Sequence, residues 1–188
     1  MTLIKNLISE TYSEDKFIQR IRVFETVRDY TYQINDANTP EKLLTCKEWY
    51  CVSKHRLLKA IYEELWYRAE LCFIPFTFDM TYLPNHLKDW WLAKKKWYHT
   101  FLRLWIDNKA IDVDSTFNKE LKDFYVVNQD WDWFSSQKMI CETKEIYIPK
   151  NQEEEYEIKK KLSDSEGFTD TDKKWIDEYN SWLKSVCL

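Results

Sequence analysis

Glycine is almost absent from this sequence, whose 188 residues contain one, Gly167. Average usage of about 7% would give about 13 glycines in a chain of this length. Turns must therefore use Asn, Asp or other residues where glycine would enter the left-handed region without steric cost. Aromatic residues are abundant by contrast, and ten of them are tryptophans.

Long hydrophobic runs and a basic excess are missing as well. A transmembrane helix needs about 18 consecutive apolar residues, and the sequence has no such run, so we expect no membrane partner. The opening MTLIKNLISE has an early acidic residue and no hydrophobic region of the kind that signal peptides contain. The formal net charge of −4 argues against a dedicated nucleic-acid-binding protein.

The cysteines lack the spacing of a disulfide framework. There are five, an odd number: Cys46, Cys51, Cys72, Cys141 and Cys187. Their pattern favours a reducing, cytoplasmic setting. The chain length favours one domain over residues 1–188. The oligomeric state cannot be predicted from these features.

Hydrophobic periodicity and turn residues predict an α+β fold. Helices are expected over 11–30, starting at a capping box, over 40–46 after Thr39-Pro40, and over 51–65, 85–94, 119–127 and 153–162. A last helix is expected to begin at Thr169 or Thr171. Strands are expected over 68–78, 97–106, 109–114 and 139–148.

The stretch from Cys46 to Leu65 reads as a loop that delivers Cys51 to the start of an amphipathic helix. The positive end of the helix dipole and the unpaired N–H groups of the first turn favour a thiolate there. A thiol in this position becomes a nucleophile when a histidine reaches it and a carboxylate orients the histidine. Cys51 is therefore the candidate nucleophile. Cys46 is the rival, but it has no helix of its own.

The segment from 97 to 114 predicts a β-hairpin that turns at Asp107-Asn108, two residues that tolerate positive φ. In this register Arg103 faces Asp112. His99 and Asp114 then become diagonal neighbours on one face, about 7–8 Å apart between backbones. A slip of one residue would place them on opposite faces. The pairing favours Asp114 as the partner of His99 and an ion pair with Arg103 as the role of Asp112.

A zinc site is the alternative for the same residues. Cys51 and His55 are four positions apart, and Cys46 or His99 could complete the ligand set. The sequence has no C-x-x-C and no second close ligand pair, so we expect no metal and no cofactor. His55 is then expected to pack or cap beside the cysteine helix.

Three segments resemble the transglutaminase-like superfamily: CVSKHRLL at 51–58, YHTF at 98–101 and IDVDST at 111–116. The resemblance covers about 27–117 and implies a papain-like α+β fold in which the nucleophile helix packs on an antiparallel sheet. A C-terminal helical extension would cover about 150–188. The resemblance further implies Cys51 as nucleophile, His99 as base and acid and Asp114 as orienter, with Tyr32 as a candidate oxyanion donor. The sequence departs from the family in having Trp49, Tyr50, Trp66 and Asn108 where glycine is usual.

Two functions follow. The first is a cysteine-dependent enzyme that hydrolyses or transamidates an amide or ester of a peptide, a protein or a small molecule through a thioester. The second is a catalytically silent binding or scaffold protein with the same fold. Its aromatic side chains would form a recognition surface: Trp90, Trp91, Trp97, Trp131 and Trp133.

Overall fold

A computed structural model describes residues 2–35, 48–164 and 169–187. The helices are α1 (Thr2–Glu10), α2 (Lys16–Arg28), α4 (Cys51–Glu64), α5 (Asn85–Lys88), α6 (Gln152–Leu162) and α7 (Asp170–Val186). The strands are β1 (Thr31–Tyr32), β2 (Glu48–Trp49), β3 (Arg68–Phe76), β4 (Trp97–Ile106) and β5 (Lys109–Val113). The expected helix over 40–46 lies outside the described residues.

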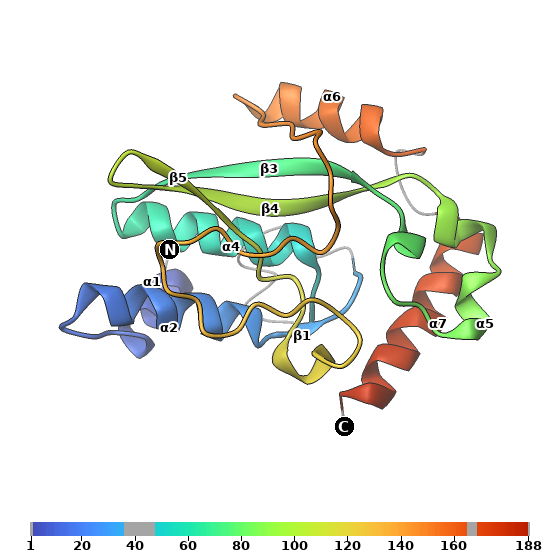
Figure 1. The fold of residues 1–188 in the computed structure, drawn as a ribbon, viewed down its shortest axis with the longest axis horizontal. Coiled ribbons are helices and arrows are strands. Elements are labelled where there is room, and N and C mark those ends of the chain that lie inside the picture. Colours follow the sequence, from blue (N-terminus) through green and yellow to red (C-terminus); the bar gives the residue numbers. More distant parts are fainter. Residues whose placement is uncertain (1, 36–47, 165–168, 188) are drawn as a thin grey trace.

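An antiparallel sheet with the order β3-β4-β5 forms the centre of the molecule (Figure 1). The β4–β5 hairpin has the predicted register, in which Arg103 pairs with Asp112 and Ile106 with Lys109. Its turn lies at Asp107 and Asn108, with φ of 49° and 64°. Both angles match a type I′ turn, whose twist suits a two-residue hairpin.

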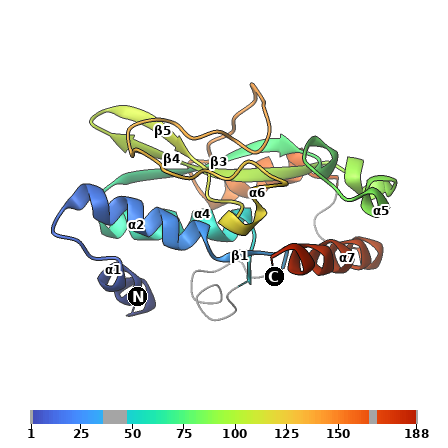
Figure 2. The same cartoon turned by 60° about the horizontal axis from the view of Figure 1, so that its bottom comes forward.

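Helix α4 covers one face of this sheet and α2 packs against α4 (Figure 2). The apolar stripe of α4 is fully buried there: Leu57, Leu58, Ile61 and Tyr62. It meets Leu102 and Leu104 of β4 in one core cluster. Full burial of each such side chain stabilises the fold by about 1.5–3 kcal/mol. The expected α+β architecture, with the cysteine helix on an antiparallel sheet, is confirmed.

A second core cluster fills the end of the sheet where β4 begins. It joins the aromatic residues of α7 to Tyr32 and Phe117. Of the two predicted caps, Thr169 and Thr171, Thr169 begins α7: its side chain accepts a hydrogen bond from the Asp172 N–H. The Asp172 carboxylate also accepts a bond of 2.7 Å from Lys95, which ties α7 to the segment before β4. The expected C-terminal helices, α6 and α7, are both present.

The predicted start of the first helix is wrong. Residues 2–10 form α1, and α2 begins at Lys16 with Asp15 as its cap, because the Asp15 carboxylate accepts from the Phe17 N–H at 2.8 Å. Thr11 opens no helix. Its hydroxyl donates instead to the Leu7 carbonyl at 2.8 Å, at the end of α1.

Three further predicted elements are shorter than expected. Residues 85–94 form α5 and a separate 3-10 turn at Trp91–Lys94. Of 119–127 only Lys119–Leu121 is helical, and Tyr125 instead stacks on Phe117 with ring centroids 3.9 Å apart. Of 139–148 only Tyr147 pairs with a strand residue, Phe73. The Ile140 N–H is directed instead to the Asp114 carboxylate at the end of the hairpin.

Candidate active site

Cys51 is the first residue of α4, and the local sequence explains why the helix begins there. Tyr50 has extended backbone angles, with φ of −110° and ψ of 176°. The Ser53 hydroxyl accepts from the Tyr50 N–H at 3.0 Å and donates to the Tyr50 carbonyl at 2.8 Å, which fixes the first turn. N–H groups of a first turn have no carbonyl partner inside the helix, so they favour negative charge beside Cys51.

Strand β2 runs directly into this helix start and pairs in parallel with β1. The register places Tyr32 opposite Trp49, two residues before the cysteine. Asn118 holds β1 from the other side, because its side-chain oxygen accepts from the Tyr32 N–H at 2.9 Å. Tyr32 is therefore brought beside the start of α4 by backbone pairing.

The His99 ring and the Asp114 carboxylate form a buried hydrogen bond of 3.0 Å between Nε2 and Oδ2. The predicted register of the hairpin, which puts both side chains on one face, predicted this contact. An ionised carboxylate only accepts, so Nε2 carries the proton and Nδ1 is the ring nitrogen left for another partner. Nδ1 is buried and has no hydrogen bond of regular geometry among the described residues.

Asp114 is held by the backbone and side chain that follow it. Its Oδ1 accepts from the Thr116 N–H at 3.0 Å and from the Thr116 hydroxyl at 2.5 Å, while the Ile140 N–H lies 3.4 Å from Oδ2. Burial alone would raise the pKa of this carboxyl, but His99 and the Thr116 hydroxyl hold the pKa well below its usual range. Asp114 is therefore ionised across the neutral pH range.

The charge state of His99 follows from the same contacts. Burial lowers the pKa of the ring, but the charge of Asp114 and its hydrogen bond, together with the nearby Cys51 thiol, raise the pKa to about 10. A ring with this pKa is protonated at neutral pH. A positive charge beside a thiol is one of the features that make a cysteine reactive.

His55 also belongs to this cluster, and sequence reasoning assigned it only packing or capping beside α4. Its Nε2 accepts from the Ser115 N–H at 2.9 Å and lies 3.6 Å from Asp114 Oδ1. Its Nδ1 must then carry the proton, which it donates to the Cys51 carbonyl at 2.7 Å. Burial is the main cause that lowers the pKa of His55 to about 4, so the ring is neutral.

The zinc alternative finds no support in this geometry. Both nitrogens of His55 are used in hydrogen bonds to the backbone. In the part of the chain that the structure describes, no group of three or more His, Cys, Asp or Glu side chains could hold a metal ion. Cys46, one of the proposed ligands and the rival nucleophile, lies outside the described residues.

The competing residues are engaged elsewhere. Asp112 forms the predicted cross-strand pair with Arg103, through two hydrogen bonds of 2.6 and 2.9 Å. Burial raises the pKa of the Cys72 thiol to about 12 and that of Cys141 to about 11. Burial also raises the pKa of Cys187. These three thiols are poor nucleophiles at neutral pH.

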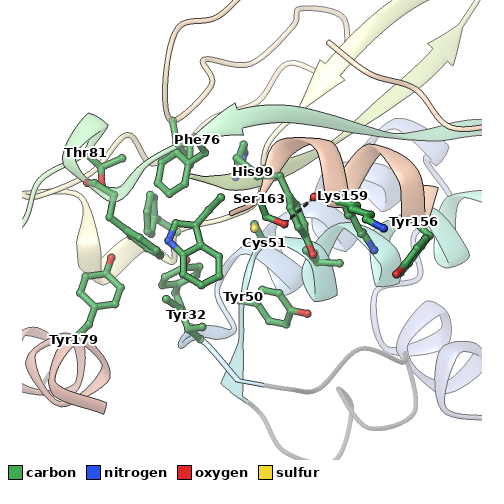
Figure 3. Close-up of a pocket in the computed structure, with 18 residues that line it drawn as sticks. Tyr32, Tyr50, Cys51, Phe76, Thr81, His99, Tyr156, Lys159, Ser163 and Tyr179 are labelled. Carbon is green, nitrogen blue, oxygen red and sulfur yellow. Dashed lines mark hydrogen bonds between the residues drawn. The ribbon is translucent and has the colours of Figure 1, made fainter. Parts of the chain in front are cut away.

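A cavity of about 290 Å³ opens at Cys51 and His99 (Figure 3). Tyr32 and Tyr50 lie on its floor, and the Cys51 sulfur lies between two arms of the cavity. One arm is lined by Phe76, Phe78, Thr81 and Tyr179, which we call the aromatic arm. On the other side of Cys51 lie Tyr156 and Lys159, which we call the lysine arm. The cysteine is 8% exposed and is reached through this cavity.

Tyr32, the candidate oxyanion donor, is among the lining residues. Its phenol is buried, and its pKa is raised well above the usual value by burial first and by the Cys51 thiol next. A phenol of this kind stays protonated and can donate a hydrogen bond. Its position beside Cys51 is compatible with the expected role.

Comparison with known proteins gives one fold-level similarity. No protein-family model and no curated protein matches the sequence. Among solved structures the chain is similar to "Crystal structure of a TGase", with 14% sequence identity and a TM-score of 0.44. The match covers 62% of this chain and 31% of that chain.

The C-terminal part supplies cavity walls that the sequence did not predict. Tyr156 and Lys159 come from α6, and Tyr179 comes from α7.

Among the described helices, none is both long enough and apolar enough to cross a bilayer.

Proposed function

We propose that this protein is a cysteine-dependent enzyme that transfers an acyl group from an amide or ester through a thioester on Cys51. The observation that carries the proposal is the hydrogen bond between His99 and Asp114 beside a cysteine that begins a helix and opens into a cavity. Nucleophilic catalysis by a thiol requires this combination of base, orienting carboxylate and access.

Cys51 reacts as the thiolate, with its proton on His99 Nδ1, because the raised pKa of the ring keeps it protonated at neutral pH. Asp114 stabilises the imidazolium that forms and keeps Nε2 protonated, since it accepts from that nitrogen at 3.0 Å. The thiolate then attacks the carbonyl carbon, and the C–S bond forms as the carbonyl π electrons move to oxygen. The first-turn N–H groups of α4 lower the free energy of the negative sulfur.

The tetrahedral oxyanion needs hydrogen-bond donors. The Cys51 N–H and the Tyr32 hydroxyl are our candidates, because the first belongs to the first turn of α4, where N–H groups have no carbonyl partner inside the helix, and Tyr32 lines the cavity with Cys51. Loss of one such donor costs a factor of about 10²–10³ in kcat in enzymes of this type.

Collapse of the tetrahedral intermediate breaks the bond to the leaving group, which takes its proton from the His99 imidazolium. The thioester on Cys51 is then attacked by water or by an amine, and neutral His99 accepts the proton of that nucleophile. Hydrolysis and transamidation share every protein residue in this scheme. The acceptor that reaches the thioester decides between them.

A silent scaffold is the second candidate, favoured by the low exposure of Cys51, which is 8%. Two other observations weigh against it. Trp49 stands where the transglutaminase-like superfamily usually has glycine. Its ring stacks on the Tyr30 ring in the core, with centroids 4.6 Å apart, and Trp49 is not among the residues that line the cavity. Trp131 and Trp133, two members of the proposed recognition surface, are buried in the core.

The test is acylation by an activated ester such as 4-nitrophenyl acetate. We expect a burst of nitrophenolate and an acetyl adduct that peptide mapping assigns to Cys51. Cys51→Ala should give neither, whereas the matched variant Cys72→Ala should keep both. Addition of a primary amine during turnover separates transamidation from hydrolysis by the product formed. A wild-type protein that forms no adduct while Cys51→Ala loses stability would decide for the scaffold.

A further inference from the structure

We propose that Asn180 of α7 is a positioning residue for acyl transfer, because its side chain fixes the segment that holds Tyr32 beside Cys51. This inference rests on the proposed function, in which the Tyr32 hydroxyl is a candidate donor to the oxyanion. It follows from two hydrogen bonds that join Asn180 to the backbone of Ile34, 146 residues away in the sequence.

Successive N–H groups at the end of β1 have different partners. The Gln33 N–H donates to a carbonyl of β2 at 2.9 Å. The Tyr32 N–H donates to the side-chain oxygen of Asn118 at 2.9 Å. The Ile34 N–H donates to the side-chain oxygen of Asn180 at 3.0 Å. Every second N–H of an extended chain points to the same side, and an edge strand leaves these groups unpaired. The two asparagines therefore take the place of a neighbouring strand.

Asn180 holds both backbone groups of Ile34. Its Oδ1 accepts from the Ile34 N–H at 3.0 Å, and its Nδ2 donates to the Ile34 carbonyl at 2.9 Å. A residue of an antiparallel strand makes the same pair of bonds with the residue opposite. Two bonds fix both the distance and the orientation of the segment, whereas a segment held by one bond could pivot about it.

The place of Asn180 in the sequence supports this role. Asparagine is an unfavourable residue inside a helix, because its side chain competes for nearby backbone groups. Asn180 nevertheless lies inside α7, where Tyr179 and Leu183 are buried in the second core cluster. The helix is thus fixed by its apolar side, and the amide of Asn180 bonds to the backbone of another segment.

The segment held by Asn180 forms part of the candidate site. Ile34 and Tyr32 both line the cavity that opens at Cys51. The Tyr32 ring meets the Phe117 ring edge to face, with centroids 4.8 Å apart. The backbone bonds of β2 and of Asn180 then set where the phenol lies relative to the sulfur. A shift of about 1 Å in such a group can lower a rate by about 100-fold.

Two reactions of Cys51 separate the position of the oxyanion donor from the reactivity of the thiol. Acylation by 4-nitrophenyl acetate passes through an oxyanion, whereas alkylation by iodoacetamide displaces iodide and forms no oxyanion. Asn180→Ala should lower the rate constant of acylation by about 10- to 100-fold, because Tyr32 loses its fixed place. The rate constant of alkylation, measured on the same protein, should stay the same.

Thr169→Ala is the matched control on the same helix. It removes the side chain that caps α7 at Asp172 and leaves the bonds to Ile34 in place. Both rate constants should stay at the wild-type value in this variant. Asn180→Asp is a second test of the position, because it keeps an acceptor for the Ile34 N–H but has no donor for the carbonyl. It should lower acylation in the same direction as Asn180→Ala. Urea unfolding sets conditions in which each variant is folded.

Tyr32→Phe shows whether Asn180 acts through Tyr32. This change removes the hydroxyl and keeps the ring that contacts Phe117. It should lower the rate constant of acylation by about 10²–10³, the cost of one oxyanion donor. Asn180→Ala should then have little further effect in the Tyr32→Phe protein, because the group that it positions is already gone.

Four results would overturn this inference and leave Cys51 as the nucleophile. They are wild-type acylation by Asn180→Ala, equal losses of acylation and alkylation in that variant, an equal loss of acylation in Thr169→Ala, and effects of Tyr32→Phe and Asn180→Ala that multiply in the double variant. Wild-type acylation by Tyr32→Phe would also overturn it. A wild-type protein that forms no acetyl adduct at Cys51 would overturn the proposed function and this inference together.

Discussion

His55 Nε2 lies 3.6 Å from Asp114 Oδ1, on the same carboxylate whose other oxygen bonds to His99. The two histidines that surround Asp114 therefore differ in charge. The pKa of His99 is raised to about 10, against the effect of burial, by its contacts with Asp114, and that of His55 is lowered to about 4, chiefly by burial. One ring is suited to exchange protons with a thiol, and the other serves as a neutral support for the chain at Ser115.

The neutral state of His55 predicts a pH dependence of folding. Its folded pKa of about 4 lies below the unfolded value of 6.5. The stability it contributes is therefore present above pH 6.5 and is lost as the pH falls to about 4, by a total of about 3 kcal/mol. His55→Gln keeps an acceptor for the Ser115 N–H but cannot titrate, so this part of the acid loss should disappear.

Urea unfolding of the wild type and His55→Gln at several pH values between 4 and 7 measures this effect. The difference between the two proteins removes the contributions of other buried groups near His55, which include Lys54, Asp114 and His99. A difference in unfolding free energy that stays constant with pH would show that His55 titrates alike in both states.

Asp114→Asn should leave the fold intact and slow acyl transfer strongly. The amide cannot stabilise the imidazolium, and it can hold the ring in the wrong tautomer. The analogous change in a serine protease lowers kcat by about 10⁴. Asp112→Asn is the matched control, because Asp112 is two residues away and bonds to Arg103 instead of His99. Burst kinetics with an activated ester compare the two variants, and equal rates would contradict the assigned role of Asp114.

Thr116 is predicted to hold Asp114 in its reactive position. Its hydroxyl donates to Asp114 Oδ1 at 2.5 Å. Thr116→Val removes this donor and should destabilise the fold by about 1.5–3 kcal/mol, the range for hydrogen bonds to charged groups. The pH profile of kcat should move as well, because the carboxyl loses a group that lowers its pKa. Thr116→Ser keeps the hydroxyl and should restore both properties, which loss of packing alone would not predict.

The scarcity of glycine predicts a site where adding one stabilises the protein. Trp66 follows α4 with φ of 68° and is 95% exposed. A side chain in this left-handed conformation costs about 1–2 kcal/mol, which glycine avoids. Trp66→Gly should raise the free energy of unfolding by about 1 kcal/mol, whereas Trp66→Ala should not. Thermal or urea unfolding of both variants checks this, and a less stable Trp66→Gly would show that the indole makes a needed contact.

The hairpin and the His99–Asp114 contact could be predicted because both depend on local rules. A turn at Asp107-Asn108 fixes the register, and the register fixes which side chains share a face. The helix that begins at Cys51 follows in the same way from one apolar stripe. These elements need no information from distant parts of the chain.

The rest of the site depends on tertiary contacts that leave no periodic pattern. Asn128 and Gln137 lie in an irregular segment, yet the Asn128 amide donates to the Asp114 carbonyl at 3.0 Å and Gln137 accepts from the Asp114 N–H at 2.7 Å. Nothing local marks these two residues. His55 did carry a signal, since it lies one helical turn after Cys51, but its Ser115 partner is set by how α4 packs on the hairpin.

The reactivity of Cys51 decides whether this residue is the nucleophile. Its rate of alkylation by iodoacetamide at pH 7 is measured by peptide-resolved mass spectrometry alongside Cys72, Cys141 and Cys187 in the same sample. We expect Cys51 to react fastest, because the positive charge of His99 favours a thiolate beside it, while burial raises the pKa of the other three thiols. If Cys51 is the slowest of the four, it is a buried structural thiol, and the nucleophile assigned to this protein is wrong.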